Sequence, residues 1–260
     1  MENPQEGHDD LNQKLVIEAD KIIRKAEEED IILRLMGSIA FRIHCPRYVH
    51  YLDSLTRTLT DVDFASYSSE RSKVENLLEE LGYTTQCYVQ VAIATLGRSM
   101  YWKKDDTRIK VDIFWDKLKM NHDIDFSGRL ELEKSTLPLS ELLQEKLQIV
   151  NLNLKDVKDT TVLLLEHDIA EKSTDREVID LSPILERVSK DWCYYYTFSK
   201  NLKTIQEMLR GLETLSDEEK SVVNDRILSV LDAFEKVPKS LGWKARARIG
   251  TRKKWYNEVE

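Results

Sequence analysis

The sequence is poor in cysteine, glycine and proline, and it has no long hydrophobic run. No apolar stretch approaches the roughly 18 residues that a transmembrane helix requires. The N-terminus, MENPQEGHDD, is acidic where a secretory signal would be basic and then apolar. The three cysteines, Cys45, Cys87 and Cys193, lack the close pairs of zinc sites and disulfide frameworks. We therefore expect a cytoplasmic protein with reduced thiols and no membrane partner.

The composition excludes a disordered chain and favours two folded domains. Hydrophobic residues make up 41% of the 260 residues and charged residues 33%, which suits real cores beneath a well-solvated exterior. A net charge of −8 argues against a protein coated in nucleic acid. Domains commonly run about 100 to 200 residues, and the apolar periodicity changes at Pro138. We therefore expect a mixed α/β domain over residues 1–138 and a helical domain with a basic tail over 139–260.

The periodicity of apolar residues before Pro138 predicts alternating helices and strands. Helices are expected over residues 11–29, 38–45 and 69–81, strands over 31–36 and 60–66, and a loop over 46–59. Short alternating stretches between residues 83 and 137 predict a region of sheet. After Pro138 the spacing is helical, over residues 139–152, 155–167, 177–189, 192–212 and 217–237. Ser216, with Glu219 three residues later, forms a capping box for the last of these helices.

Three aspartates on two predicted strands are candidate metal ligands. In TDVDFAS, Asp61 and Asp63 stand two residues apart, so both carboxylates project from one face of the strand. In RIKVDIFW, Asp112 faces away from the apolar side. If the two strands are neighbours, the three carboxylates converge on a site for magnesium, which takes oxygen ligands and serves displacement at phosphorus. The alternative is a solvated strand face on which Arg108 and Lys110 neutralise Asp112.

Gly37 and Ser38 follow the first predicted strand and supply a complementary feature. A glycine lets the backbone come close to a ligand, and the N-terminus of the next helix offers free N–H groups and a positive dipole end to a phosphate. The alternative is an ordinary strand-to-helix turn with a serine cap. The order along the chain is strand, Gly-Ser, helix, strand with Asp-x-Asp, and a later strand with one Asp.

LMGSIAF, TDVDFA and KVDIFW, in that order, resemble the three motifs of the nucleotidyltransferase fold. That superfamily includes DNA polymerase beta, the aminoglycoside nucleotidyltransferases and the abortive-infection toxins. The resemblance implies an α/β fold class, with a mixed sheet, flanking helices and a helical C-terminal lobe. It also implies that Gly37 and Ser38 hold the nucleotide phosphates. Asp61, Asp63 and Asp112 would bind two Mg²⁺ ions, or Mn²⁺, and Asp112 would activate the attacking hydroxyl.

The helices after Pro138 contribute three further candidates. Lys146 lies on an apolar helical stripe, and lysine is seldom buried without a partner. It either snorkels to solvent or reaches the triphosphate. The segment that contains it and the following KDVKD resemble the abortive-infection toxins, which carry a lysine and then a basic-Asp-x-x-Asp motif. This resemblance makes Lys146 and Lys155 candidate nucleotide ligands, and Lys146 and Asp159 candidate catalytic residues. A plain i,i+4 salt bridge between Lys155 and Asp159 is the alternative.

Aromatic and basic residues are concentrated near the C-terminus. The run Trp192, Tyr194, Tyr195, Tyr196 and Phe198 is expected in the core of the helical domain rather than as a stacking platform. Between Lys236 and Lys254 there are eight basic residues and no acidic one. This tail suits phosphates and stacked bases, or it docks as structure through Trp243, Ile249 and Trp255. We favour the structural role.

The sequence thus indicates a metal-dependent enzyme that transfers a nucleoside monophosphate from an NTP to an acceptor hydroxyl. Nothing in the residues fixes the acceptor, which is an RNA, a protein or a small molecule. One alternative is a non-catalytic module of the same fold that senses a nucleotide or binds a partner protein. Another is the toxin of a toxin–antitoxin pair, with an antitoxin-like protein as its partner.

Overall fold

The computed structural model describes residues 4–54, 59–86, 90 and 96–259, and the chain divides into two compact units. The first unit comprises Met1–Ile43, Thr56–Lys119 and Asp123–Pro138. The second comprises His44–Leu55, Met120–His122 and Leu139–Glu260. The main division falls at Pro138, where the apolar periodicity changes. The segment predicted as one domain, 1–138, is interrupted twice, because His44–Leu55 and Met120–His122 belong to the second unit.

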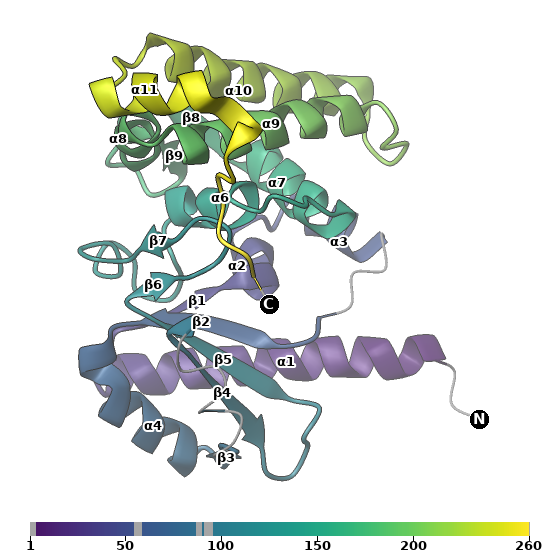
Figure 1. The fold of residues 1–260 in the computed structure, drawn as a ribbon. Coiled ribbons are helices and arrows are strands. Elements are labelled where there is room, and N and C mark those ends of the chain that lie inside the picture. Colours follow the sequence, from purple (N-terminus) through teal and green to yellow (C-terminus); the bar gives the residue numbers. More distant parts are fainter. Residues whose placement is uncertain (1–3, 55–58, 87–89, 91–95, 260) are drawn as a thin grey trace. The chain divides into compact units, whose positions relative to one another are not determined.

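The first unit is built on a mixed five-stranded sheet in the order β1-β2-β5-β4-β3 (Figure 1). Its strands are β1 (Leu33–Met36), β2 (Val62–Ser66), β3 (Tyr83–Thr84), β4 (Arg98–Lys103) and β5 (Lys110–Trp115). The pair β2–β5 is parallel, whereas the pairs β1–β2, β4–β5 and β3–β4 are antiparallel. A two-stranded ribbon of β6 (Lys117–Leu118) and β7 (Ile124–Asp125) follows.

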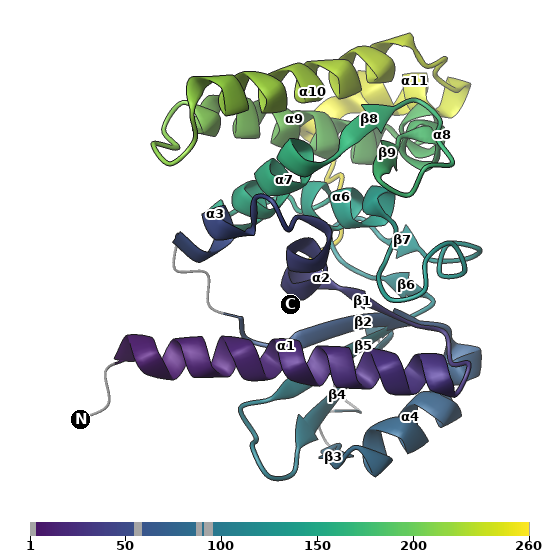
Figure 2. The same cartoon turned by 180° about the vertical axis from the view of Figure 1, so that it is seen from behind.

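Helices α1 (Pro4–Glu28) and α4 (Arg71–Glu80) pack against the strands of this sheet. The unit also contains α2 (Gly37–His44), which follows β1, and the 3-10 turn η1 (Ser68–Glu70). Helix α1 runs along the sheet (Figure 2) and contacts β1, β2 and α4. Along β5, Val111, Ile113 and Trp115 are buried, so Lys110, Asp112 and Phe114 lie on the opposite face.

The second unit is helical, with one small pair of strands. Its helices are α3 (Val49–Ser54), α6 (Leu139–Leu147), α7 (Leu154–Glu166), α8 (Ser182–Lys190), α9 (Trp192–Leu209), α10 (Asp217–Lys236), α11 (Leu241–Ile249) and the 3-10 turn η3 (Gly250–Arg252). Strands β8 (Asp168–Ala170) and β9 (Val178–Asp180) pair in parallel. Asn153 caps α7, and the predicted capping box of Ser216 and Glu219 is present at α10. The predicted fold class, a mixed α/β sheet followed by a helical C-terminal part, is confirmed.

Several elements differ from the sequence prediction, and for three of them the structure shows the reason. The loop expected over residues 46–59 contains α3. The helix expected from residue 177 begins at Ser182, because residues 178–180 pair with β8 and Pro183 stands at the start of the helix. Helix α6 ends at Leu147 rather than at residue 152, because the Asn201 side chain donates to the carbonyls of Leu147 and Ile149, at 2.9 and 2.5 Å. These carbonyls bond to a side chain where a longer helix would use backbone N–H groups.

Aromatic contacts anchor the basic tail within the second unit. Trp192, Tyr194 and Phe198 are buried, as predicted for core residues of this part, whereas Tyr195 and Tyr196, predicted with them, are only half-buried. The Trp243 ring lies edge-on to Tyr195 at 5.2 Å, and the Trp255 ring lies edge-on to Tyr196 at 5.3 Å. The two tryptophans thus dock the tail, whereas Ile249, the third predicted anchor, is 43% exposed. Cys45 and Cys193 are free thiols, and Cys87 lies outside the described residues. None of the described helices combines the length and hydropathy needed to cross a bilayer.

A buried hydrogen-bonded chain links the tail to the segment Met120–His122. Trp255 Nε1 donates to Thr197 Oγ1 at 3.1 Å, and His122 Nε2 lies 2.8 Å from the same oxygen. The Thr197 oxygen can accept from both groups or donate to His122 Nε2, depending on the tautomer of the ring. Burial lowers the pKa of His122 to about 4, and the nearby Arg187 acts in the same direction. The buried ring is therefore neutral at neutral pH.

We expect the second unit to lose stability as the pH falls from about 6.5 to about 4. The pKa of His122 is lower in the folded protein than the ordinary 6.5, so the unfolded chain takes up the proton first. The loss from this residue approaches about 3 kcal/mol at the acidic end. The measurement is the denaturant midpoint of wild type and His122→Gln across this range. An equally steep pH dependence in the variant would contradict this assignment.

Candidate functional site

The structure brings the three predicted carboxylates together in the first unit. Asp61, Asp63 and Asp112 each offer one oxygen, and these atoms all lie within 4.8 Å of one another. The cause is strand pairing, because β2 and β5 are parallel neighbours with Asp63 directly opposite Asp112. Asp61 lies two residues before Asp63 and projects from the same face. The donor set is hard and oxygen-only, which fits Mg²⁺ or Mn²⁺.

Gly37 brings backbone directly against this cluster. It follows β1, whose last residue, Met36, is paired with Asp63. Gly37 has φ +67°, and a Cβ atom built on it would lie 2.5 Å from Asp63 Oδ2. Glycine is therefore required here twice, for the left-handed backbone and for the close approach. The predicted Gly-Ser turn thus touches the Asp-x-Asp pair, and it does so within one unit.

Ser38 lies in the first turn of α2, because the helix begins at Gly37. The sequence prediction placed Ser38 as the cap before the helix, so the helix starts one residue earlier. Ser38 is half-buried. The Gly37-Ser38 turn thus places the N-terminal end of α2, where the helix dipole is positive, beside the carboxylates.

Asp112 is the most desolvated of the three carboxylates. The residue is 2% exposed, and its Oδ1 is buried with no hydrogen-bond partner. Burial raises the pKa of Asp112 to about 6, Asp61 acts in the same direction, and Arg98 and Lys110 oppose it. A buried carboxylate oxygen without a donor is costly. This atom is well placed to serve as a ligand.

Two basic side chains accompany the carboxylates. Lys110 Nζ lies 3.2 Å from Asp61 Oδ2, and Arg98 Nη2 lies 3.1 Å from Asp112 Oδ2. The sequence alternative, in which Arg108 and Lys110 neutralise Asp112, is wrong in its pairing, because Arg108 binds Asp106. Arg98 was missed because it comes from β4, where it stands opposite Phe114. Its signal is the alternation of β4, which places Arg98 on the half-exposed face together with Met100 and Trp102.

Lys146, Lys155 and Asp159 belong to the second unit, whereas the other candidates belong to the first. Lys146 is 7% exposed, with Nζ 2.8 Å from Glu145 and 3.4 Å from Asp159. Burial opposes its charge, yet Glu145, Asp159 and Asp156 together raise the pKa of Lys146 above its ordinary value. The snorkelling alternative is therefore wrong.

The partners of the other two residues differ from the predicted i,i+4 salt bridge. Asp159 is fully buried and pairs with Lys146. Lys155 is exposed in the first turn of α7, where its backbone N–H donates to the Asn153 cap. The predicted approach of Lys146 and Lys155 to a nucleotide bound at Gly37 and Ser38 stays a prediction.

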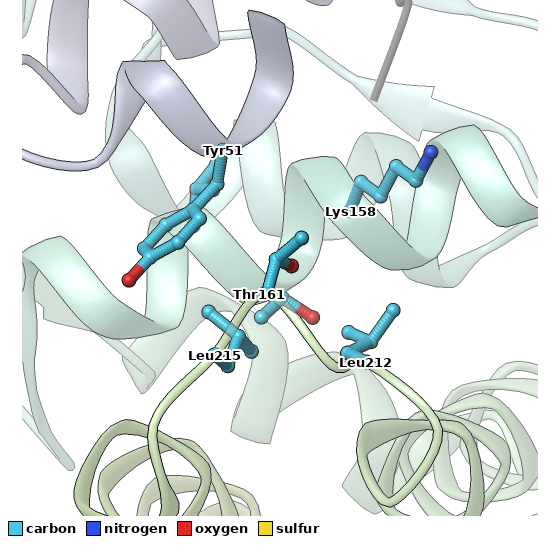
Figure 3. Close-up of a pocket in the computed structure, with 7 residues that line it drawn as sticks. Tyr51, Lys158, Thr161, Leu212 and Leu215 are labelled. Atoms are coloured by element: carbon cyan, nitrogen blue, oxygen red, sulfur yellow. The ribbon is translucent and has the colours of Figure 1, made fainter. Parts of the chain in front are cut away.

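A pocket in the second unit is too small for a substrate. It is lined by Tyr51, Lys158, Thr161, Val162, Leu212, Thr214 and Leu215 (Figure 3). The volume open to a water-sized sphere is about 10 Å³, which is about the room one water molecule needs. The Thr161 hydroxyl oxygen is buried there without a hydrogen-bond partner. A single water molecule is the occupant that this size allows.

Comparison with known proteins gives one similar structure. No protein-family model and no curated protein matches the chain. Among solved structures, it is similar to the solution structure of the antibiotic-resistance factor ANT(2'')-Ia, an aminoglycoside nucleotidyltransferase. The identity is 12% and the TM-score 0.37, over 86% of this chain and 96% of that chain. A likeness at this level defines neither a family nor an activity for this chain.

We expect Gly37→Ala to destabilise the protein more than Gly82→Ala. Both glycines have positive φ, but a Cβ on Gly82 meets nothing within 4 Å, whereas one on Gly37 meets Asp63. The shared backbone strain costs on the order of 1 kcal/mol. The additional loss in Gly37→Ala measures the clash with Asp63. Denaturant unfolding of the two variants gives the comparison, and equal losses would contradict the tight fit at Asp63.

We expect Lys146→Met to lower the free energy of unfolding by about 3 to 5 kcal/mol. The substitution leaves Glu145 and Asp159 buried without their cation, which is the costly way to break a buried pair. Adding Asp159→Asn should recover part of this loss. Lys190→Met, which breaks an exposed pair with Glu186, is the control and should change stability by less than about 1 kcal/mol. A loss in Lys146→Met no larger than in the control would show that the buried pairs do not stabilise the fold.

Proposed function

We propose that this protein is a metal-dependent nucleotidyltransferase that transfers a nucleoside monophosphate from an NTP to an acceptor hydroxyl. The observation that carries the proposal is the convergence of Asp61, Asp63 and Asp112, with the buried Oδ1 of Asp112 lacking any hydrogen-bond partner. Three carboxylates side by side repel one another unless a cation joins them. Such a donor set fits Mg²⁺, or Mn²⁺ in its place.

The reaction is a displacement at the α-phosphorus. The acceptor oxygen forms a bond to the α-phosphorus while the bond to the β-phosphate oxygen breaks, and pyrophosphate leaves. The hydroxyl proton passes to a base, and the resemblance to the nucleotidyltransferase motifs makes Asp112 the candidate for it. Divalent ions, when bound, polarise the α-phosphate and lower the pKa of the acceptor hydroxyl. Asp61, Asp63 and Asp112 supply the oxygens that hold those ions.

The remaining candidates are assigned to the nucleotide. Gly37 and Ser38 place the N-terminal end of α2 beside Asp63, and the positive end of a helix dipole suits the phosphates of the nucleotide that the carboxylates serve. Lys146, Lys155 and Asp159 are proposed to act on the triphosphate side, with Lys146 kept charged by its acidic neighbours. The resemblance of their segment to abortive-infection toxins is the ground for this assignment.

The proposal does not specify the class of molecule that accepts the nucleoside monophosphate. An RNA, a protein and a small hydroxylated molecule are all consistent with the residues of the first unit. The packing of Trp243 and Trp255 on aromatic side chains favours a structural tail, and this weakens the case for RNA. The non-catalytic alternative would keep nucleotide binding and lose transfer, so a transfer assay separates the two.

The test is incubation of the purified protein with each α-labelled NTP and Mg²⁺ or Mn²⁺. Total RNA, lysate protein and a panel of hydroxylated small molecules serve as acceptors. We expect label on one acceptor class, pyrophosphate release, and a loss of about 100-fold or more in Asp63→Asn, since even indirect partners of a metal are worth 10- to 100-fold. Asp20→Asn, an exposed carboxylate on α1 paired with Arg24, is the control and should keep full activity. Transfer that survives in Asp63→Asn would overturn the proposed site.

A further inference from the structure

The carboxylate cluster carries two cations of its own. Lys110 and Arg98 each bind the Oδ2 atom of one carboxylate, Lys110 that of Asp61 at 3.2 Å and Arg98 that of Asp112 at 3.1 Å. The side chains of Lys110 and Asp61 are each 27% exposed, and those of Arg98 and Asp112 are 28% and 3% exposed. The Arg98–Asp112 pair is thus open to solvent on its cationic side and buried on its carboxylate side, whereas both members of the Lys110–Asp61 pair are partly exposed.

Arg98 is held over the cluster by more than its charge. Its Nη2 atom lies 3.3 Å from the Met100 sulfur, and its guanidinium lies 5.5 Å from the centroid of the Phe114 ring. Strand pairing fixes its origin, because Arg98 stands opposite Phe114 on β4 and Met100 stands opposite Asp112. The guanidinium therefore occupies a built position between strands β4 and β5.

The two pairs leave the cluster with a small net charge. Three carboxylates face two cations, which hold Asp112 Oδ2 and Asp61 Oδ2. The buried Oδ1 of Asp112 stays outside these pairs. A divalent ion at this cluster is nevertheless repelled by the charges of Lys110 and Arg98, and it competes with them wherever it takes an oxygen that they hold.

We propose that Lys110 and Arg98 are internal counter-cations that lower the affinity of the carboxylate cluster for a divalent ion until a nucleotide binds with it. The proposal rests on the metal site of the proposed function. A nucleotide brings phosphate oxygens, so the displaced ammonium and guanidinium groups find new anionic partners beside the cluster. Metal and nucleotide then bind with positive coupling, because each pays part of the cost of moving these side chains.

Removing a residue from a binding site usually weakens binding, but here we expect removal of either cation to strengthen the binding of the metal ion. Lys110→Met should tighten the binding of Mn²⁺ alone by about two- to fivefold, since a partly exposed pair is worth up to about 1 kcal/mol. Arg98→Met should act in the same direction. Both variants should reduce the factor by which a non-hydrolysable NTP analogue tightens Mn²⁺ binding.

The experiment is a titration of the metal-free, full-length protein with Mn²⁺, with and without the analogue. Binding is measured by calorimetry and by the loss of the EPR signal of free Mn²⁺. Lys73→Met is the matched control, because it removes the same charge from an exposed pair with Glu70 in the same unit. It should leave both affinities unchanged. Circular dichroism checks that each variant is folded, and Arg98→Gln, which also removes the charge, replaces Arg98→Met if the latter does not fold.

Unchanged or weaker Mn²⁺ binding by Lys110→Met would overturn the proposal, because it would make the pairs supports of the site rather than competitors for it. The same holds if the coupling to the analogue is unaltered. Failure of the wild type to bind Mn²⁺ at all would remove the metal site itself, and with it the proposed function. Wild-type binding with unchanged variants would leave that function standing.

Discussion

The site depends on the parallel pairing of β2 with β5. This pairing places Asp63 directly beside Asp112, an arrangement of like charges that a sheet normally avoids. The apolar side of the same two strands, including Val62 and Val111, is fully buried. A shift of one residue would turn Val62 or Val111 outward and a carboxylate inward. Core packing thus fixes the register, and the register imposes the electrostatic cost at the site.

The other features of the first unit compensate for that cost or make use of it. Gly37 allows backbone to approach Asp63 where any side chain would collide. Arg98, on the neighbouring strand β4, and Lys110, on β5 itself, offset part of the excess negative charge of the carboxylates. The buried Asp112 keeps an unsatisfied oxygen and a raised pKa, the pattern expected of a group that waits for a ligand. Strain and charge are therefore concentrated around β2 and β5, two interior strands of one sheet.

The sequence predicted which face of each strand carries the carboxylates, because alternation along TDVDFAS and KVDIFW is a local pattern. The pairing of the two strands is not local, and the expectation of a cluster rested on the order of the motifs and on their resemblance to known ones. Alternation also put Arg98 on the half-exposed face of β4, but it could not place Arg98 beside Asp112, since that depends on how β4 aligns with β5. Strands β8 and β9 were missed because three residues carry too little pattern. The end of α6 depends on Asn201, more than fifty residues away, and no local signal reports such a contact.

The way the chain divides into two units limits which parts of it could be exchanged by recombination. The chain passes from one unit to the other five times, because His44–Leu55 and Met120–His122 are inserted into the sequence of the first unit. Cutting at Pro138 would remove α7, whose Glu166 binds Arg47, and α9, whose Thr197 bonds to His122. Neither unit is therefore a contiguous, portable module. Recombination that exchanged residues after Pro138 alone would leave behind His44–Leu55 and Met120–His122, which belong to the second unit. The two units are therefore expected to evolve together.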